Sequence, residues 1–258
     1  MQHPERSTDA SPVRKIIHLP TDVGGNAQNM SLQMKRLGAN SVSLVTRGSY
    51  FKYGGDIVLG TKATNRFLLE LRKLKALSYI FQYDVVFFNF GQTLYTPITP
   101  DPSASPLKRL LRTTHSLFYR LIQRLELSIL AWRNCTLLIQ YQGDDARQGD
   151  ALRERYSYSH VDEVDSAYYA PHSDEHKRKQ IALIAPRCRR VYALNPDLLS
   201  VLPPNAEFLP YGHIDLDDWL PEYRPRQGGV LRVGHAPTHR AAKGTKYVIQ
   251  AVEALKSQ

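Results

Sequence analysis

Cysteine is scarce in this chain, where only Cys135 and Cys188 occur among 258 residues. The two lie far apart and form no close pair of the kind that binds zinc, so the sequence indicates neither a disulfide framework nor a zinc site. A charged, tyrosine-rich segment contains His160, His172 and His176, but no carboxylate or cysteine lies at ligand spacing from them. We therefore expect surface histidines, no metal centre, and a protein suited to a reducing cytoplasm.

Long apolar runs are also missing. No stretch of about 20 uncharged apolar residues occurs, so the sequence contains no transmembrane helix. The start of the chain is polar and charged, and we expect residues 1–12 to be a loose tail and not a signal peptide. These absences favour a cytoplasmic protein. Peripheral attachment at the inner face of the membrane is compatible with them.

One dinucleotide-binding signature and one nucleic-acid-binding signature are absent from the sequence. The first apolar strand is followed by Asp22-Val23-Gly24-Gly25-Asn26, which lacks the three-glycine dinucleotide fingerprint, and a dinucleotide-dependent oxidoreductase is disfavoured. No internal repeat occurs. The sequence also lacks a basic motif interleaved with aromatic residues, so nothing in it indicates a nucleic-acid partner. Positive charge is nevertheless in excess, because 34 Lys plus Arg oppose 24 Asp plus Glu and give a net charge of +10. This balance indicates anionic partners.

The order of predicted elements is that of an α/β protein with a Rossmann-like, doubly wound parallel sheet. Strands are predicted at residues 14–19, 41–46, 84–90, 135–140 and 190–194, with a last strand ending within 208–212, and helices at 66–80 and 107–133. The pair Gly24 and Gly25 follows the first strand, where it lets the backbone approach a ligand. We predict one domain over residues 13–212, a linker over 213–229, and the first strand and helix of a second Rossmann-like domain over 230–258.

The predicted helix at 107–133 is amphipathic and basic. Its apolar face contains Leu107, Leu111, Phe118, Leu121, Leu125, Ile129 and Trp132, and the cations Lys108, Arg109, Arg112, Arg120 and Arg124 lie largely off that face. The favoured interpretation packs the apolar face on the sheet and leaves the basic face in solvent. In the alternative, the helix rests on anionic lipid.

Two charged loops are candidate binding sites. The turn at 141–147, Tyr-Gln-Gly-Asp-Asp-Ala-Arg, follows a buried strand, where open α/β sheets place ligand residues. Equally, its Asp and Arg could form a structural salt bridge that pins the loop. The second loop follows an apolar run at 230–233 and precedes a helix that opens at Gly244 and Thr245. Its cations, together with the free N–H groups of that helix start, suit a phosphate or diphosphate, although such loops are often only solvated surface.

The amino-acid sequence of these segments resembles that of family-4 glycosyltransferases of the GT-B fold. The similarity to the start of their donor-binding domain lies in the run HAPTHRAAKGT followed by YVIQAVEAL, and NPDLLSVLPPNAEFLPYG is similar to the end of their N-terminal domain. The resemblance implies that Arg240, Lys243 and the helix opening at Gly244 contact a nucleotide-sugar diphosphate. It also implies that Gly24 and Gly25 approach the donor from the opposite wall.

The turn at 141–147 resembles the family segment His-Gly-x-Asp-x-Arg beside the reacting sugar. Gly143, Asp145 and Arg147 match, and the resemblance implies catalytic positions at Asp145 and Arg147. Two departures occur: Gln142 stands where a His is common, and His235 stands where the commoner family pattern has its Arg.

The resemblance implies transfer of a sugar from a nucleotide-diphosphate donor to a hydroxyl of a glycan or a lipid-linked acceptor, as in polysaccharide biosynthesis. It implies retention of configuration, with no metal and no other cofactor. Only the first strand and helix of the donor domain have counterparts, so we expect a truncated transferase that is weakly active or inactive by itself. The alternative is a non-catalytic module that binds a glycan, an anionic membrane surface or a partner subunit.

Overall fold

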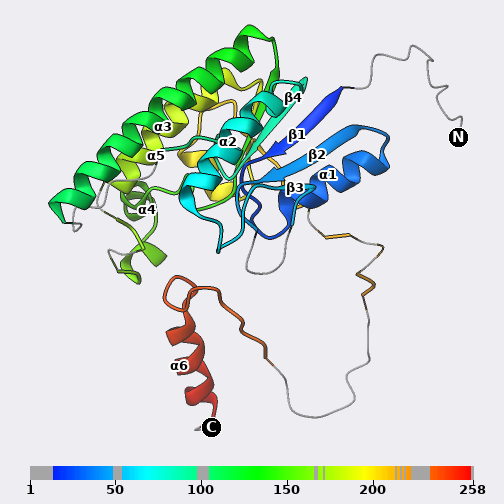
Figure 1. Cartoon of the computed structure of the whole chain (residues 1–258). Helices are drawn as coiled ribbons and strands as arrows, with labels where there is room; N and C mark the ends of the chain where they lie inside the picture. Colours follow the sequence, from blue (N-terminus) through cyan, green and yellow to red (C-terminus); the bar gives the residue numbers. More distant parts are fainter. Residues whose placement is uncertain are drawn as a thin grey trace, which may run out of the picture.

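The computed structural model describes residues 14–48, 54–97, 105–165, 168–170, 172–212, 214–215, 217, 219–221 and 233–256. Within these ranges, seven strands form one sheet in the order β3-β2-β1-β4-β5-β6-β7, and every neighbouring pair is parallel (Figure 1). The direction of strand addition reverses between β1 and β4, so the predicted doubly wound α/β class is confirmed.

The elements lie close to their predicted positions. The strands are β1 (Lys15–Leu19), β2 (Asn40–Val45), β3 (Ile57–Val58), β4 (Val85–Asn89), β5 (Thr136–Tyr141), β6 (Arg190–Ala193) and β7 (Glu207–Phe208). The α-helices are α1 (Asn26–Arg36), α2 (Arg66–Ile80), α3 (Pro106–Trp132), α4 (Gly149–Arg155), α5 (Ser173–Ile184) and α6 (Thr245–Lys256). The sequence patterns did not predict β3, α4 and α5, because β3 has two residues and the two helices are mostly polar. Most of the predicted strand at 230–233, and the tail at 1–12, lie outside the described residues, and Val233 belongs to no strand.

The two faces of the sheet differ in chemistry. Right-handed connections place α1 on one face and α2, α3 and α5 on the other. The face under α2, α3 and α5 is apolar and forms the core; its buried strand residues include Ile17, Leu19, Val86, Phe88, Ile139 and Val191. Alternation along the strands puts polar residues on the α1 side, where His18, Ser41, Ser43, Asn89 and Gln140 are buried.

The favoured interpretation of the long amphipathic helix is wrong. Six of the seven residues of its predicted apolar face are exposed in α3, and only Ile129 is partly buried. The face that packs on the core instead carries Ser116, Tyr119, Gln123, Glu126, Leu127 and Leu130.

Hydrogen bonds explain this orientation of α3. The Glu126 carboxylate accepts the backbone N–H groups of Leu94 (3.1 Å) and Tyr95 (3.3 Å), in the loop after β4. Gln123 Nε2 donates to Thr93 Oγ1 at 3.1 Å in the same loop. A buried N–H group left without a partner costs free energy, so this polar face is held inward and the apolar stripe faces out. Within the part of the chain that the structure describes, no helix combines the length and the apolar character needed to cross a bilayer.

We predict that His18→Leu stabilises the fold. The His18 ring is fully buried 5.3 Å from the Phe87 ring, and neither ring nitrogen has a hydrogen-bond partner among the described residues. Burial lowers the His18 pKa from 6.5 to about 4. Removing an unpaired buried polar group should raise the free energy of unfolding by about 1–3 kcal/mol at neutral pH.

The pH dependence has a defined sign. Because the folded pKa of His18 is depressed, its contribution to stability is lost as the pH falls from 6.5 to 4. The leucine variant lacks this loss, so the gap between the two proteins should widen by about 3 kcal/mol. Urea unfolding across this pH range measures the gap. His172→Asn is the control: it removes an exposed histidine whose left-handed backbone (φ 63°) asparagine tolerates, and it should leave the profile nearly unchanged. A gap that stays constant with pH would contradict the prediction.

Candidate functional site

The loops at the carboxyl ends of β1, β2, β4 and β5 surround a cavity of about 620 Å³, which we call the switch-point cavity. It lies where the strand order reverses, the usual ligand position in open α/β sheets. Its lining combines the cationic groups Arg47, Lys73 and Lys177 with the carboxyl groups Asp22, Asp144 and Asp145. A cavity with both signs of charge, together with threonine and glutamine side chains, can hydrogen-bond a polar ligand.

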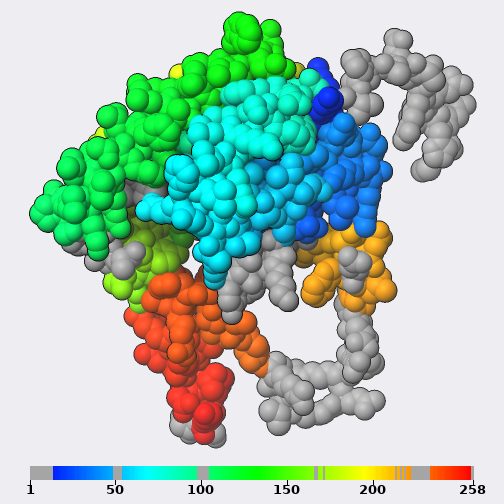
Figure 2. Space-filling view, viewed as in Figure 1, coloured from blue at the N-terminus to red at the C-terminus, as the bar shows by residue number. Residues whose placement is uncertain are grey.

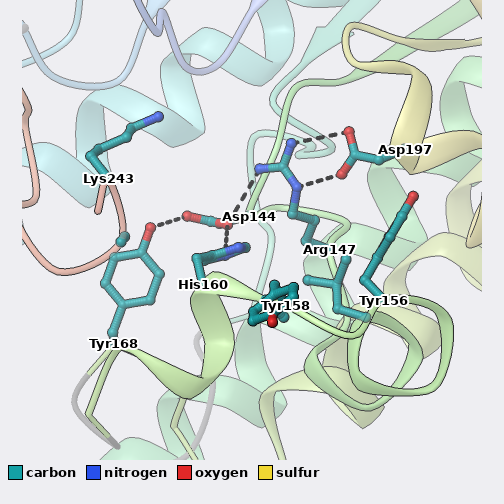
Figure 3. A pocket seen from close by; sticks show the side chains of 11 residues that line it. Asp144, Arg147, Tyr156, Tyr158, His160, Tyr168, Asp197 and Lys243 are labelled. Carbon is teal, nitrogen blue, oxygen red and sulfur yellow. Dashed lines mark hydrogen bonds and ion pairs between the residues drawn. The ribbon is translucent and has the colours of Figure 1, made fainter. Parts of the chain in front are cut away.

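A second hollow of about 410 Å³, the outer cavity, lies beside the same β5 loop (Figure 3). Its lining includes Asp144, Arg147, His160, Asp197 and, from the basic loop near the end of the chain, Lys243. Asp144 lines both cavities. The loop after β5 therefore lies between two binding spaces, with Asp144 at both cavities and Asp145 at the switch-point cavity.

Asp145 is bonded to its own loop. Its carboxylate accepts the N–H groups of Gly143 at 2.6 Å and of Gln142 at 3.0 Å. Burial raises the Asp145 pKa to about 6, although these N–H groups favour the charged form. The side chain also borders the switch-point cavity, but its hydrogen bonds shape the turn. The carboxylate of this predicted catalytic residue therefore stabilises the conformation of its own loop.

Arg147 forms an ion pair, but its partner is not Asp145. Its guanidinium donates two hydrogen bonds to the Asp197 carboxylate, Nε–Oδ2 at 2.6 Å and Nη2–Oδ1 at 3.2 Å. Its Nη1 atom lies 3.7 Å from Asp144 (Figure 3). Burial disfavours the charge, but these carboxylates outweigh it, so the Arg147 pKa lies above its usual value. A two-point pair of this kind fixes the guanidinium at the wall of the outer cavity.

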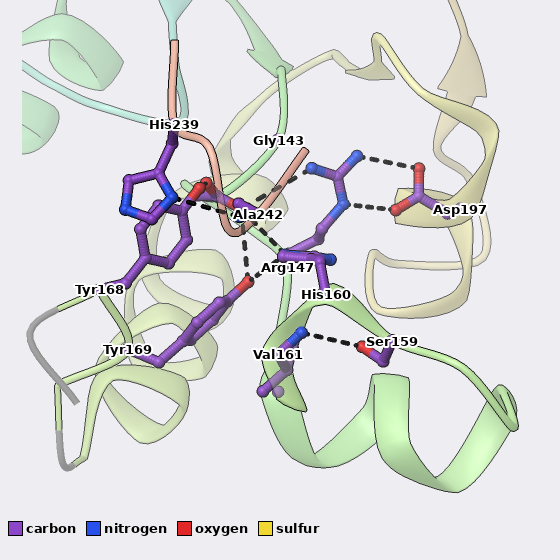
Figure 4. Close-up of polar contacts among 12 residues, drawn as sticks. Gly143, Arg147, Ser159, His160, Val161, Tyr168, Tyr169, Asp197, His239 and Ala242 are labelled. Carbon is purple, nitrogen blue, oxygen red and sulfur yellow. Dashed lines mark hydrogen bonds and ion pairs between the residues drawn. The ribbon is translucent and has the colours of Figure 1, made fainter. Parts of the chain in front are cut away.

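Asp144 is the centre of a hydrogen-bonded group that the sequence did not reveal. The hydroxyls of Tyr168 and Tyr169 donate to its two oxygens, the second at 3.3 Å (Figure 4). His160 Nε2 lies 3.3 Å from the Tyr169 hydroxyl and 3.9 Å from Asp144. Burial and Asp144 raise the Tyr168 pKa to about 12, and burial lowers the His160 pKa, so the tyrosines stay protonated and His160 is mostly neutral at pH 7.

The basic loop is held against this group. The His239 ring lies 4.6 Å from the Tyr168 ring and accepts the Ala242 N–H at 3.2 Å (Figure 4). Lys243 follows and reaches the outer cavity. Gly244, with φ of 66°, then turns the chain into α6, whose Tyr247 hydroxyl donates to Glu163 at 2.6 Å.

The predicted donor-side residues are not all brought together. Gly24 (φ 67°) and Gly25 (φ 80°) make the tight turn into α1, and neither lines either cavity, so the approach of their backbone to a ligand stays a prediction. Arg240 and Gly244 also lie outside both linings. Of the predicted site residues, Lys243 and Arg147 therefore line the outer cavity, and Asp145 lines the switch-point cavity.

Several residues at the two cavities were missed by the sequence analysis. Asp144 belongs to the charged turn at 141–147 and could have been found by treating both of its carboxylates as candidates. Lys73, Tyr168 and Asp197 are distant in sequence and carry no motif, so only the fold assembles them. Two of the three histidines expected at the surface, His160 and His176, are partly buried, and His176 borders the switch-point cavity.

Comparisons with known proteins add no family. No protein-family model matches the chain, and no curated protein matches it significantly. Among the described residues, no group of three or more His, Cys, Asp or Glu side chains is placed to hold a metal ion.

We predict that Asp145→Ala destabilises the fold by roughly 2–4 kcal/mol, because N–H groups of the turn lose their acceptor. Asp145→Asn keeps one acceptor oxygen and should lose less than half as much. Chemical denaturation measures both values, with Glu154→Ala as the control, because this exposed carboxylate forms no ion pair or hydrogen bond among the described residues. Equal stability of the alanine variant and the wild type would show that the turn does not depend on this carboxylate.

The pair Arg147 and Asp197 should behave as one unit. Arg147→Met and Asp197→Asn are each expected to lower the free energy of unfolding by about 1–3 kcal/mol, and the double variant by less than the sum. A double-mutant cycle by urea unfolding gives the coupling, which we expect at about 1–2 kcal/mol. The exposed pair of Arg190 and Glu207 is the matched control and should couple by less than about 1 kcal/mol. Additive losses at Arg147 and Asp197 would contradict the structural pairing.

Proposed function

We propose that the chain is a glycosyltransferase-like protein that binds the diphosphate of a nucleotide sugar at the loop before α6. The observation that carries this proposal is the position of Lys243, which lies in the outer cavity opposite Arg147, at the carboxyl end of β5 (Figure 3). The resemblance of the loop's sequence to the diphosphate loop of family-4 glycosyltransferases supports the same assignment.

The charges of the outer cavity favour an anion near Lys243. Arg147 is balanced by Asp197 and Asp144. Among the described residues, the side chains of Lys243 and Arg240 form no ion pair or hydrogen bond. These two cations therefore remain available, and the N-terminus of α6 adds partial positive charge at the same turn.

The proposed reaction breaks the bond between the sugar and the diphosphate and joins the sugar to an acceptor oxygen with retained configuration. Negative charge grows on the departing diphosphate, so Lys243, Arg240 and the start of α6 would stabilise the transition state more than the ground state. In this proposal the cations of the loop do the work of charge stabilisation without a metal or other cofactor.

The switch-point cavity is the proposed acceptor site. Asp22 and Asp144 offer carboxylate oxygens to sugar hydroxyls, and Thr21, whose hydroxyl donates to Gln92 at 2.8 Å, ties the β1 loop to the β4 loop across it. Asp144 lines both cavities and so stands between the proposed donor and acceptor. Asp145 and Arg147 support this arrangement by fixing the loop that carries Asp144.

We predict that Lys243→Ala and Arg240→Ala each weaken binding of uridine, guanosine or adenosine diphosphate by roughly tenfold, because a cation contact to phosphate is lost. Isothermal titration with the three nucleotides, and with the corresponding nucleosides, measures the effect. Lys179→Ala, at an exposed position, is the matched control and should bind as the wild type does. Nucleosides that bind as tightly as their diphosphates, or diphosphate binding that both variants leave intact, would refute the assignment of the loop.

A non-catalytic binding module is the second candidate, and α6 favours it. Its apolar residues Ile249, Val252 and Leu255 are 40–68% exposed. A helix with an uncovered apolar face suits a partner subunit. Binding of nucleotide sugars without any release of nucleoside diphosphate, on its own and with membranes supplied as acceptor, would favour this candidate over sugar transfer.

A further inference from the structure

The outward face of α3 carries an uncovered row of large apolar side chains, which we call the α3 stripe. Its members are Leu107, Leu110, Leu111, Leu117, Phe118, Leu121, Leu125 and Trp132, with exposed fractions from 44% for Phe118 to 82% for Trp132. At 3.6 residues per turn, Leu110, Leu117 and Leu121 lie nearly opposite the buried Gln123 and Leu130. The stripe therefore points directly away from the sheet, and α3 lies on the outer surface in Figure 2.

Cations border the stripe and carboxylates do not. At 3.6 residues per turn, Lys108, Arg120 and Arg124 lie nearest the two edges of the stripe and are exposed, whereas Arg109 and Arg112 lie on the other side of α3. The helix has one acidic residue, Glu126, which is fully buried and bonded to the loop after β4. The exposed surface of α3 is thus apolar in the middle and positively charged beside it, which complements a surface of negative charge over hydrocarbon.

The polar groups near the stripe cost little to remove from water. The Thr114 hydroxyl donates to the carbonyl of Leu111 at 3.0 Å, and the Thr113 hydroxyl to that of Arg109 at 2.9 Å. These hydroxyls keep a hydrogen bond in an apolar environment, which removes most of the penalty of transfer from water.

The neighbouring helix α2 extends this surface. Tyr119 of α3 donates to Glu70 at 2.6 Å and accepts from Lys73 at 3.0 Å, so the two helices lie side by side (Figure 2). On α2, Phe67 and Leu71 are 73% and 47% exposed. Two adjacent helices of one layer therefore present apolar residues to the outside.

We propose that α3 lies in the interface of an anionic lipid bilayer, with its stripe among the upper acyl chains and its cations on lipid phosphates. A second copy of the chain fits the face less well, since pairing two α3 helices would place their cations together with no exposed carboxylate on either helix. With 27 residues, the helix spans about 40 Å, enough for an extended contact in the plane of the membrane. The proposal goes beyond sugar transfer and does not depend on nucleotide binding.

The test is binding of the full chain to phosphatidylcholine vesicles prepared with and without phosphatidylglycerol, measured by flotation at low and high salt. We expect binding only to the vesicles with phosphatidylglycerol, weakened by salt. The double variant Leu117→Glu, Leu121→Glu should bind at least about tenfold more weakly. The triple variant Lys108→Gln, Arg120→Gln, Arg124→Gln should lose roughly 100-fold, at about fivefold per cation.

The matched control is Ile249→Glu, Leu255→Glu on α6, which makes the same change in charge at exposed apolar positions and should bind as the wild type does. All replaced residues are exposed, and circular dichroism with thermal unfolding confirms that each variant is folded. A second readout uses the Trp219→Phe variant, in which Trp132 is the remaining tryptophan of the chain. Its emission should shift to shorter wavelength with anionic vesicles.

Three results would overturn the proposal. The first is no binding to anionic vesicles at low salt, and the second is an equal loss in the α6 control, which would mean charge attraction without the stripe. The third is a dimer in light scattering that Leu117→Glu, Leu121→Glu dissociates while vesicle binding is absent, because a second copy would then cover the face.

Discussion

A buried carboxylate sets the orientation of the longest helix, and much of the molecule's surface depends on it. Glu126 is fully buried, and burial raises its pKa to about 7. It still finds partners, because the N–H groups of Leu94 and Tyr95 point at its oxygens. Those N–H groups belong to a loop that would otherwise bury them unpaired, so helix and loop satisfy each other.

This arrangement joins the inside of the protein to its outside. The loop that Glu126 and Gln123 hold lines the switch-point cavity through Thr93 and Leu94. The same contacts turn the apolar residues of α3 outward. The cavity proposed for a hydroxyl acceptor, through the loop after β4, and the face proposed for lipid therefore both depend on the orientation of α3. A lipid-linked acceptor would reconcile the two proposals.

The β5 loop shows how a short charged motif divides its work. Asp145 folds back on its own turn, and Arg147 reaches across to Asp197. Asp144, between them in sequence, is the residue that borders both cavities and receives the tyrosine hydroxyls. The contacts of Asp145 and Arg147 hold the loop with Asp144 at the boundary of the two cavities, so different residues shape the loop and border the binding spaces.

The order of apolar and polar residues along the chain was enough to predict the class of fold and the place of its main elements. Apolar runs such as 84–90 predict buried parallel strands, because most side chains of a strand covered on both faces are removed from water. The helix predicted at 66–80 has the bounds of α2. The buried face of α3, in contrast, depends on contacts between segments that are far apart in the chain. Amphipathic periodicity identifies an apolar face, but the hydrogen bonds of Glu126 and Gln123 with a loop about 30 residues away in sequence outweighed it. The neighbours of Arg147 and Lys243 depend on the tertiary structure too, since contacts between residues far apart in the chain leave no local pattern.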